Sequence, residues 1–164
     1  MIGIAEFRGT ASTTVRADAR AVFGLITDIA RLPEWNAAVE RILELPPRVV
    51  NGEEWVAVIH PRRMPAWKSR SRIEEVDPGD LRFRYTSRNE DGNPSYAEWA
   101  WEVAPRDDHT DVTVRWDVHL KTIDRKVIAA PIRRRALARE VPASLRALGT
   151  VLRGPDMDGR GSEL

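Results

Sequence analysis

Three side chains in this sequence have the types that acid–base or oxyanion chemistry uses. His60 ends an apolar run, Tyr85 shares a strand face with Leu81 and Phe83, and Arg41 is in phase with Val39 and Leu43. A histidine or a tyrosine can transfer a proton, and a fixed cation can stabilise a developing oxyanion. Their spacing does not assemble them into a set, so they are candidates only and the catalytic residues stay unassigned.

The patterns of the common catalytic and metal centres are missing from the sequence. It has no cysteine, which excludes disulfides, thiol catalysis and zinc–thiolate sites. His109 falls in a polar turn and His119 on the charged side of a strand, so no pair has metal-ligand spacing. Neither a nucleophile–base–orienter set nor a Gly-rich phosphate loop can be found. We therefore expect no metal and no cofactor.

Composition and charge are ordinary for a soluble globular protein. The chain has 164 residues, of which 31% are charged and 42% hydrophobic, with a formal net charge of +1. That balance gives no general attraction to nucleic acid or anionic membrane, and we read the basic run 133–135 as a solvated helix face. No apolar run approaches the roughly 20 residues of a membrane span, and no secretory signal is visible. We expect a cytoplasmic protein without stable membrane insertion. The oligomeric state stays open.

Tryptophan is unusually frequent, with six residues against three Phe and two Tyr. In the stretch SYAEWAWEV, Trp99 and Trp101 share one face of a strand, and Glu98 and Glu102 share the other. Three further stretches, 67–74, 81–88 and 111–120, alternate in the same way. Their apolar faces together gather the aromatic side chains Trp67, Phe83, Tyr85, Trp99, Trp101 and Trp116. These rings either fill a solid core or line a cavity.

The elements that position these rings follow from periodicity and turn residues. A strand near 7–16 precedes a helix that Asp18 can cap and a short second helix that Asp28 can cap. Six strands with short, polar connections follow, which favours antiparallel neighbours. A long helix is expected from about 121 to 152, with a break near Pro131 and a kink before Pro142.

The apolar face of the sheet needs a cover, and the long helix is the only amphipathic element that can supply one. Leu137 and Val141 lie on its apolar stripe. The sequence therefore predicts an α+β fold in which a curved antiparallel sheet wraps a C-terminal helix. Residues 1–153 form one domain in this interpretation, and residues 154–164 form a disordered tail. Two strands, near 39–45 and 53–61, have no clear inward face.

The stretch AVFGLITDIARLPEWNAAV resembles the helix-pair signature of the START-related superfamily (SRPBCC), with its expected marks at Phe23, Asp28, Pro33 and Trp35. This superfamily includes the birch-pollen-allergen-like proteins and bacterial polyketide cyclases. The later stretches YAEWAWEV and REVPASLRAL resemble its bacterial polyketide cyclase/dehydrase members. The resemblance covers about residues 5–153 and implies the helix-grip fold.

The resemblance also implies a deep apolar cavity between the sheet and the terminal helix. Such proteins hold lipids, sterols, aromatic polyketides or plant metabolites, so a hydrophobic or aromatic small molecule is the expected partner. The residues expected to bind it are Trp35, Trp67, Phe83, Tyr85, Trp99, Trp101, Trp116, Leu137 and Val141.

Three functions remain open at this point. The first is a binder of such a molecule, acting as a carrier or sensor. The second is a polyketide cyclase or aromatase that uses Tyr85, His60 or Arg41; against it, Lys68, Arg70 and Arg72 are in outward phase where cyclase members carry basic cavity residues. The third is a protein-binding module of the co-chaperone type.

Overall fold

A computed structural model describes residues 6–122, 124–125 and 129–153. Its elements follow the predicted order of one strand, short helices, six strands and a long helix, and the predicted tail at 154–164 lies outside the described residues. In chain order the elements are β1 (Glu6–Val15), α1 (Ala19–Thr27), the 3-10 helix η1 (Ile29–Arg31), α2 (Leu32–Trp35), β2 (Val39–Glu44), β3 (Glu54–Ile59), β4 (Trp67–Asp77), β5 (Arg82–Asn89), β6 (Tyr96–Pro105), β7 (Thr110–His119) and α3 (Ala130–Arg153).

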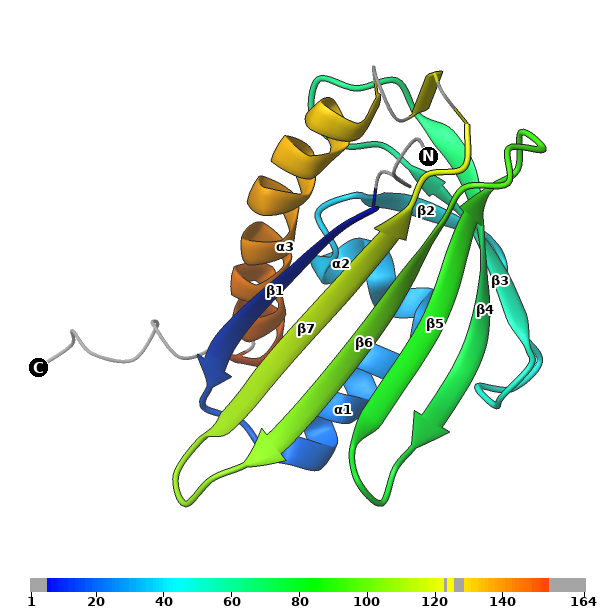
Figure 1. Cartoon of the computed structure of the whole chain (residues 1–164). Helices are drawn as coiled ribbons and strands as arrows, with labels where there is room; N and C mark the ends of the chain where they lie inside the picture. The colour runs from blue at the N-terminus through cyan, green and yellow to red at the C-terminus, as the bar shows by residue number, and fades with distance from the viewer. Residues whose placement is uncertain (1–5, 123, 126–128, 154–164) are drawn as a thin grey trace, which may run out of the picture.

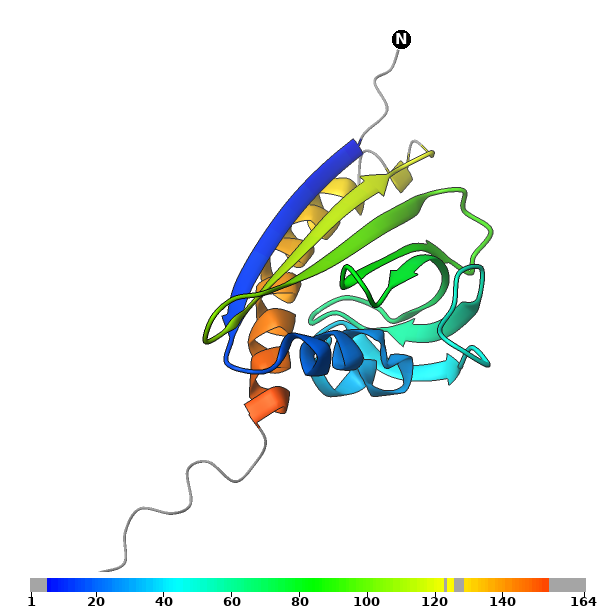
Figure 2. The same cartoon turned by 90° about the horizontal axis from the view of Figure 1, so that it is seen from below.

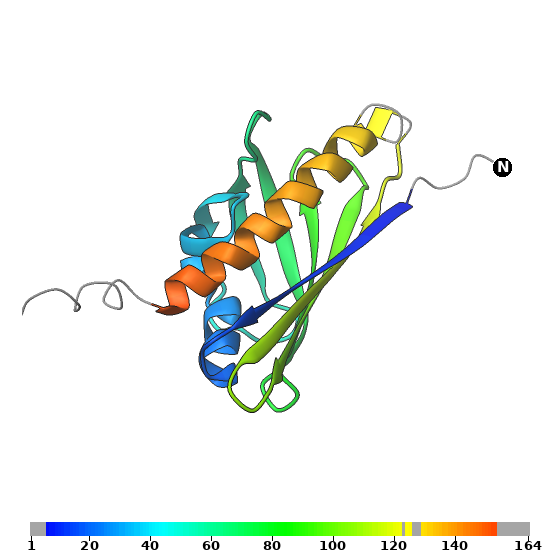
Figure 3. The same ribbon diagram turned by 90° about the vertical axis from the view of Figure 1, so that its left-hand side faces the viewer.

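The seven strands form one antiparallel sheet in the order β1-β7-β6-β5-β4-β3-β2. Figure 1 shows the strands fanned out in front of the helices, and Figure 2 shows the sheet curling into a deep arc. The long helix α3 crosses the concave side of this arc diagonally, as Figure 3 shows. This is the predicted α+β helix-grip fold, in which one sheet face packs on helices and the other faces solvent.

Helix α1 closes one end of the arc. The Asp18 carboxylate caps it by accepting hydrogen bonds from the backbone N–H groups of Arg20 and Ala21, at 3.1 and 3.2 Å. Asp28 was expected to cap the next helix in the same way, but its side chain makes no capping bond. Its backbone N–H instead bonds to the carbonyl of Leu25 and ends α1. Only half of the predicted capping pattern is therefore present.

Residues 121 and 122 are not helical and α3 begins at Ala130, while much of the predicted helix start between them lies outside the described residues. Pro131 explains this boundary: a proline lacks the backbone N–H, which is not needed in the first turn but would be missed further along. Pro142 lies inside α3 and does not end it. The predicted stripe is confirmed, since Leu137 and Val141 are both buried.

Charged side chains cover the convex face of the sheet, as predicted. Arg8 of β1 pairs with Asp117 of β7 at 3.1 Å, and Arg115 of β7 pairs with Glu102 of β6 at 3.1 Å. Because these groups are well exposed, each pair contributes little, of order 0.2–1 kcal/mol. The convex face is therefore a solvated, ion-paired surface. Lys68 and the guanidinium of Arg70 also belong to it.

The two strands whose inward faces were unclear lie at one side of the sheet. Strand β3 is buried on both faces from Trp55 to Val58. Strand β2 is an edge strand, and its Arg41 side chain is 64% exposed beside Glu40. An inward orientation of Arg41 is therefore wrong. An edge strand can turn a charged residue to solvent because only one neighbour covers it.

Gly9 of β1 leaves the space that a tryptophan ring fills. It pairs with Trp116 of β7, and a Cβ built on it would overlap the Trp116 indole. We expect Gly9→Ala to lower the free energy of unfolding by about 2 kcal/mol, because overpacking a core typically costs 1–3 kcal/mol. Denaturant unfolding measures this change.

Gly24 of α1 offers the matched control, since a Cβ there would meet nothing within 4 Å. The same substitution at Gly24 should raise stability by roughly 0.5–1 kcal/mol, because alanine restricts the unfolded chain and favours the helix. Equal effects at the two glycines would show that Trp116 does not fill the space above Gly9.

Candidate functional site

The concave face of the sheet and helix α3 enclose a cavity of about 490 Å³. Such a volume lies within the range of roughly 300–1,000 Å³ that small-molecule sites occupy. Strands β3 to β6 supply aromatic rings to its wall, and α3 supplies aliphatic side chains. The main apolar lining residues are Trp55, Trp67, Tyr85, Trp99, Trp101, Leu137 and Val141.

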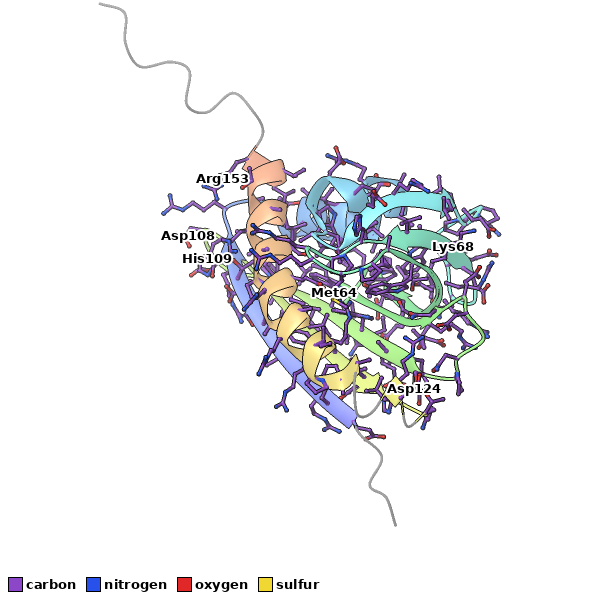
Figure 4. All side chains as sticks on the ribbon, turned by 90° about the horizontal axis from the view of Figure 1, so that it is seen from above. Met64, Lys68, Asp108, His109, Asp124 and Arg153 are labelled. Carbon is purple, nitrogen blue, oxygen red and sulfur yellow. The ribbon has the colours of Figure 1, made fainter. Side chains whose placement is uncertain are left out.

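The cavity occupies only one end of the concave face, and α1 fills the other end. Phe23 and Ile26 of α1 belong to the buried core together with Ile73, Phe83 and Val112. None of these five side chains lines the cavity. The opposite end stays open because α3 and the loop around Met64 cover it without filling it. Figure 4 shows Met64 between α3 and the sheet, while Lys68 points away on the convex side. The aromatic face is therefore part solid core and part cavity wall.

Six of the nine residues expected to bind a ligand line the cavity: Trp67, Tyr85, Trp99, Trp101, Leu137 and Val141. The other three stand behind this wall. Trp35 meets Trp101 edge to face, with ring centroids 5.4 Å apart. Phe83 and Trp116 pack against Tyr85 and Trp99 at 5.3 and 5.9 Å. The alternation of residues along a strand could not separate cavity-lining residues from those packed behind them. Alternation identifies a face of the sheet, whereas the cavity covers only one end of that face.

The sequence analysis missed Trp55 as a wall residue. It is 3% exposed and its ring centroid lies 4.9 Å from that of Tyr85. Since β3 is apolar on both faces, alternation carried no signal there. The register with β4, which places Trp55 beside Ser71, is the information that would have revealed its direction.

Hydroxyl groups provide polar points within the apolar wall. Ser69, Ser71 and Ser87 line the cavity, and the Oγ atoms of Ser71 and Ser87 lie 2.6 Å apart. Ser144 of α3 accepts a hydrogen bond from the backbone N–H of Ala37 at 2.9 Å, which ties the helix to the chain before β2. Two of the three strand serines therefore satisfy one another, while all three keep contact with the cavity.

Only one of the three candidate acid–base residues lines the cavity, namely Tyr85. His60 is 49% exposed on its side chain and lies 3.6 Å from the Glu40 carboxylate. Arg41 also points to solvent, as described above. Edge strand β2 and the end of β3 hold both residues outside, so neither can reach a molecule in the cavity without a rearrangement.

Burial raises the pKa of the Tyr85 phenol to about 12, and a side-chain hydrogen bond with Trp101 acts in the opposite direction. Tyr85 is therefore a neutral hydrogen-bonding group at physiological pH. The folded state keeps its proton above pH 10, where an unfolded chain loses it. Stability from this group is complete below about pH 10 and decreases as pH rises towards 12.

Wild type and Tyr85→Phe should therefore differ in their response to alkali. Between pH 10 and 11 we expect the wild type to lose roughly 1 kcal/mol more unfolding free energy than Tyr85→Phe, since one pKa unit corresponds to about 1.36 kcal/mol. Urea unfolding at several pH values measures the difference. Parallel pH profiles for the two proteins would contradict the assignment.

Helix α3 brings a partly buried ion pair to the cavity wall. Arg133 Nη1 lies 3.0 Å from each oxygen of the Glu140 carboxylate, and the two side chains are 22% and 12% exposed. The Arg133 guanidinium also lies over the ring of Trp67, 5.2 Å from its centroid. Burial lowers the pKa of Arg133, and Glu140 opposes this effect.

The expectation of a solvated helix face at 133–135 is therefore wrong for Arg133. Arg134 and Arg135 are exposed, but Arg133 lies four residues before Leu137 and seven before Glu140. Residues at these spacings share one helix face. The apolar stripe, extended by one turn, was the signal that could have placed Arg133 inside.

The cavity mouth is polar. Asn89, Asn93 and Arg88 line it, and Arg125 forms an ion pair there with Asp91. Among the described residues, no group of three or more histidine, aspartate or glutamate side chains could hold a metal ion. Within the same part of the chain, no helix is long and apolar enough to cross a membrane.

Known structures share this architecture at low sequence identity. The Zhui aromatase/cyclase from Streptomyces sp. R1128 superposes with a TM-score of 0.72 at 16% identity, covering 90% of this chain and 94% of that one. A START superfamily protein from Mycobacterium smegmatis gives 0.71 at 14% identity, with 89% and 97% covered. A Thalictrum norcoclaurine synthase mutant, in complex with a transition-state analogue, gives 0.65 at 15% identity, with 90% and 97% covered. These likenesses establish the fold.

Comparison of the sequence with family profiles assigns the chain to a family, which the structural likenesses alone do not. A comparison with curated proteins finds no significant match. The profile of the family described as "Polyketide cyclase / dehydrase and lipid transport" matches residues 6–153, which span every element from β1 to α3. The resemblance to the START-related superfamily is thereby confirmed. The chain belongs to the polyketide cyclase/dehydrase and lipid transport family.

Proposed function

We propose that this protein binds a hydrophobic or aromatic small molecule in the cavity between the sheet and α3. The observation that carries the proposal is an internal space of about 490 Å³ whose wall contains four tryptophans and Tyr85. Rigid aromatic walls with a few polar points are typical of small-molecule pockets. The family description, which names lipid transport and polyketide cyclases, supports the same class of ligand. We expect the protein to act in the cytoplasm.

Cyclase chemistry is the second candidate, and Tyr85 is the observation that favours it. Its phenol lines the cavity, holds a proton at neutral pH and could donate it to a carbonyl oxygen. The aromatase/cyclase likeness of the Zhui structure supports this candidate at the level of fold. A co-chaperone role predicts a collapsed cavity, and the open space argues against it.

A ligand panel tests the proposal. We expect at least one of a fatty acid, a sterol or a polycyclic aromatic hydrocarbon to change tryptophan emission and raise the melting temperature. Four of the six tryptophans line the cavity, so emission should respond directly. At a ligand concentration of 100 times Kd the stabilisation should be about 2.7 kcal/mol. If all three classes leave both readouts unchanged, the proposal fails.

Carriage and catalysis can be separated with Tyr85→Phe. A carrier should bind its ligand nearly as well without the phenol oxygen. A cyclase should keep binding but lose conversion of a linear poly-β-ketone to a ring product, by about 10²–10⁴-fold for a lost general acid. No turnover by wild type with any such substrate would leave carriage as the function.

A further inference from the structure

The Arg133–Glu140 pair is an ionic group in an otherwise largely apolar cavity wall. Both residues are among those that line the cavity, and they lie on the same face of α3 as Leu137. An ion pair in such a place is not needed for packing, because apolar side chains of similar size often serve stability equally well. Because the pair lines the cavity, it is placed to contact a ligand bound there.

The hydrogen bonds of the pair leave part of the guanidinium unused. An arginine has five N–H donors, and both bonds to Glu140 come from Nη1. Within the described part of the chain, Nε and Nη2 of Arg133 have no hydrogen-bond acceptor, because both recorded bonds of this side chain come from Nη1. The guanidinium also lies over the Trp67 ring, a cation–π contact that restrains it. Because Arg133 lines the cavity, its remaining donors are available to an acceptor there.

The charge balance limits which acceptor fits. Glu140 already neutralises Arg133, so the pair presents fixed donors without a net charge. A carboxylate at this point would leave one uncompensated negative charge in a poorly solvated place, which is unfavourable. A carbonyl oxygen accepts the same hydrogen bonds without that penalty. The cations at the mouth do not change this balance, because Arg125 is paired with Asp91 and Arg88 is exposed.

We propose that Arg133, held by Glu140 and Trp67, is a subsite for the neutral carbonyl oxygen of an otherwise apolar ligand. This inference rests on the proposed function, because it requires a molecule in the cavity. It goes further by naming the group that the ligand must carry, an aryl or conjugated ketone, and by excluding a carboxylate at the same position.

Three naphthalene probes of similar shape test the subsite: 2-acetonaphthone, 2-ethylnaphthalene and 2-naphthoate. The first presents a carbonyl oxygen, the second has no hydrogen-bond acceptor, and the third presents a carboxylate. Calorimetric titration gives Kd for each probe with wild type, with Arg133→Met/Glu140→Leu and with Glu140→Gln. Comparing one probe across proteins removes the intrinsic differences in hydrophobicity between the probes.

The double variant should weaken 2-acetonaphthone binding by about 10- to 100-fold, the range expected for a hydrogen bond to a charged group. Binding of 2-ethylnaphthalene should stay within threefold of wild type. Glu140→Gln frees the charge of Arg133, so it should tighten 2-naphthoate binding by about tenfold or more. The Glu140→Gln variant also tests the subsite if the double variant does not fold.

An exposed charge on the same helix provides the control. Arg139→Met changes the net charge beside Glu140, but Arg139 is exposed and does not line the cavity. It should leave all three affinities within threefold. Equal losses of the ketone and the hydrocarbon in the double variant would overturn the subsite while leaving the proposed function intact. An unchanged 2-naphthoate affinity in Glu140→Gln would also overturn it. No binding of any probe to wild type would overturn the subsite, whereas the proposed function would fall only if the fatty acid and the sterol also failed to bind.

Discussion

Ala97→Trp is expected to weaken binding of 2-ethylnaphthalene about 100-fold or more, which corresponds to roughly 2.7 kcal/mol. Ala97 lies on the concave face of β6, between Ser87 of β5 and Val118 of β7, and lines the cavity. A new indole there would occupy the space that a bicyclic probe needs. Calorimetric titration measures the loss, and a cooperative thermal transition shows that the variant is folded.

The same strand supplies a matched control at Ala100. This residue lies on the convex face of β6, between Arg84 and Arg115, and does not line the cavity. Ala100→Trp adds an identical side chain to the opposite face, and binding should remain within threefold of wild type. If both variants bind like wild type, the probe does not use the cavity. If both lose binding equally, the loss reports a general disturbance of β6.

Arg133→Met should lower the free energy of unfolding by about 3 kcal/mol. It leaves the Glu140 carboxylate, which is only 12% exposed, without its partner. Removing one member of a buried ion pair typically costs 3–5 kcal/mol, and the remaining exposure of the pair places this case at the low end. Urea unfolding at pH 7 measures the change.

Removing both charges should restore most of that stability. Arg133→Met/Glu140→Leu replaces the pair with apolar side chains, a change that is often neutral or stabilising. The difference between the single and double variants is the coupling between the two residues. Arg134→Met, at an exposed position on the same helix, should change stability by no more than about 0.5 kcal/mol. If Arg133→Met behaves like Arg134→Met, the pair is not buried.

The architecture could be predicted from the sequence because four of the seven strands, β4 to β7, carried a period-two signal over many residues. In β7, Val112, Val114 and Trp116 alternate with charged or polar neighbours, and the structure buries all three. Element ends were less predictable. The start of α3 lies beside Pro131, and periodicity alone does not locate it.

The site was only partly predictable, for two physical reasons. Alternation shows which face a side chain occupies, but it does not show where along that face another element packs. Phe83 and Tyr85 share a face of β5, yet Phe83 is part of the buried core and Tyr85 lies in the cavity wall. The second reason is that a buried charge contradicts the polarity pattern. Arg133 was therefore assigned to solvent, although its spacing from Leu137 placed it on the inner stripe.

The position of a bound probe tests the central claim most directly. Crystals grown with saturating 6-bromo-2-acetonaphthone would reveal its bromine by anomalous scattering. The account predicts one bromine peak inside the cavity, bounded by Trp67, Tyr85 and Trp99 on the sheet side and by α3 on the other. A peak only on the outer surface, or an empty cavity under these conditions, would contradict the claim that this space is the binding site.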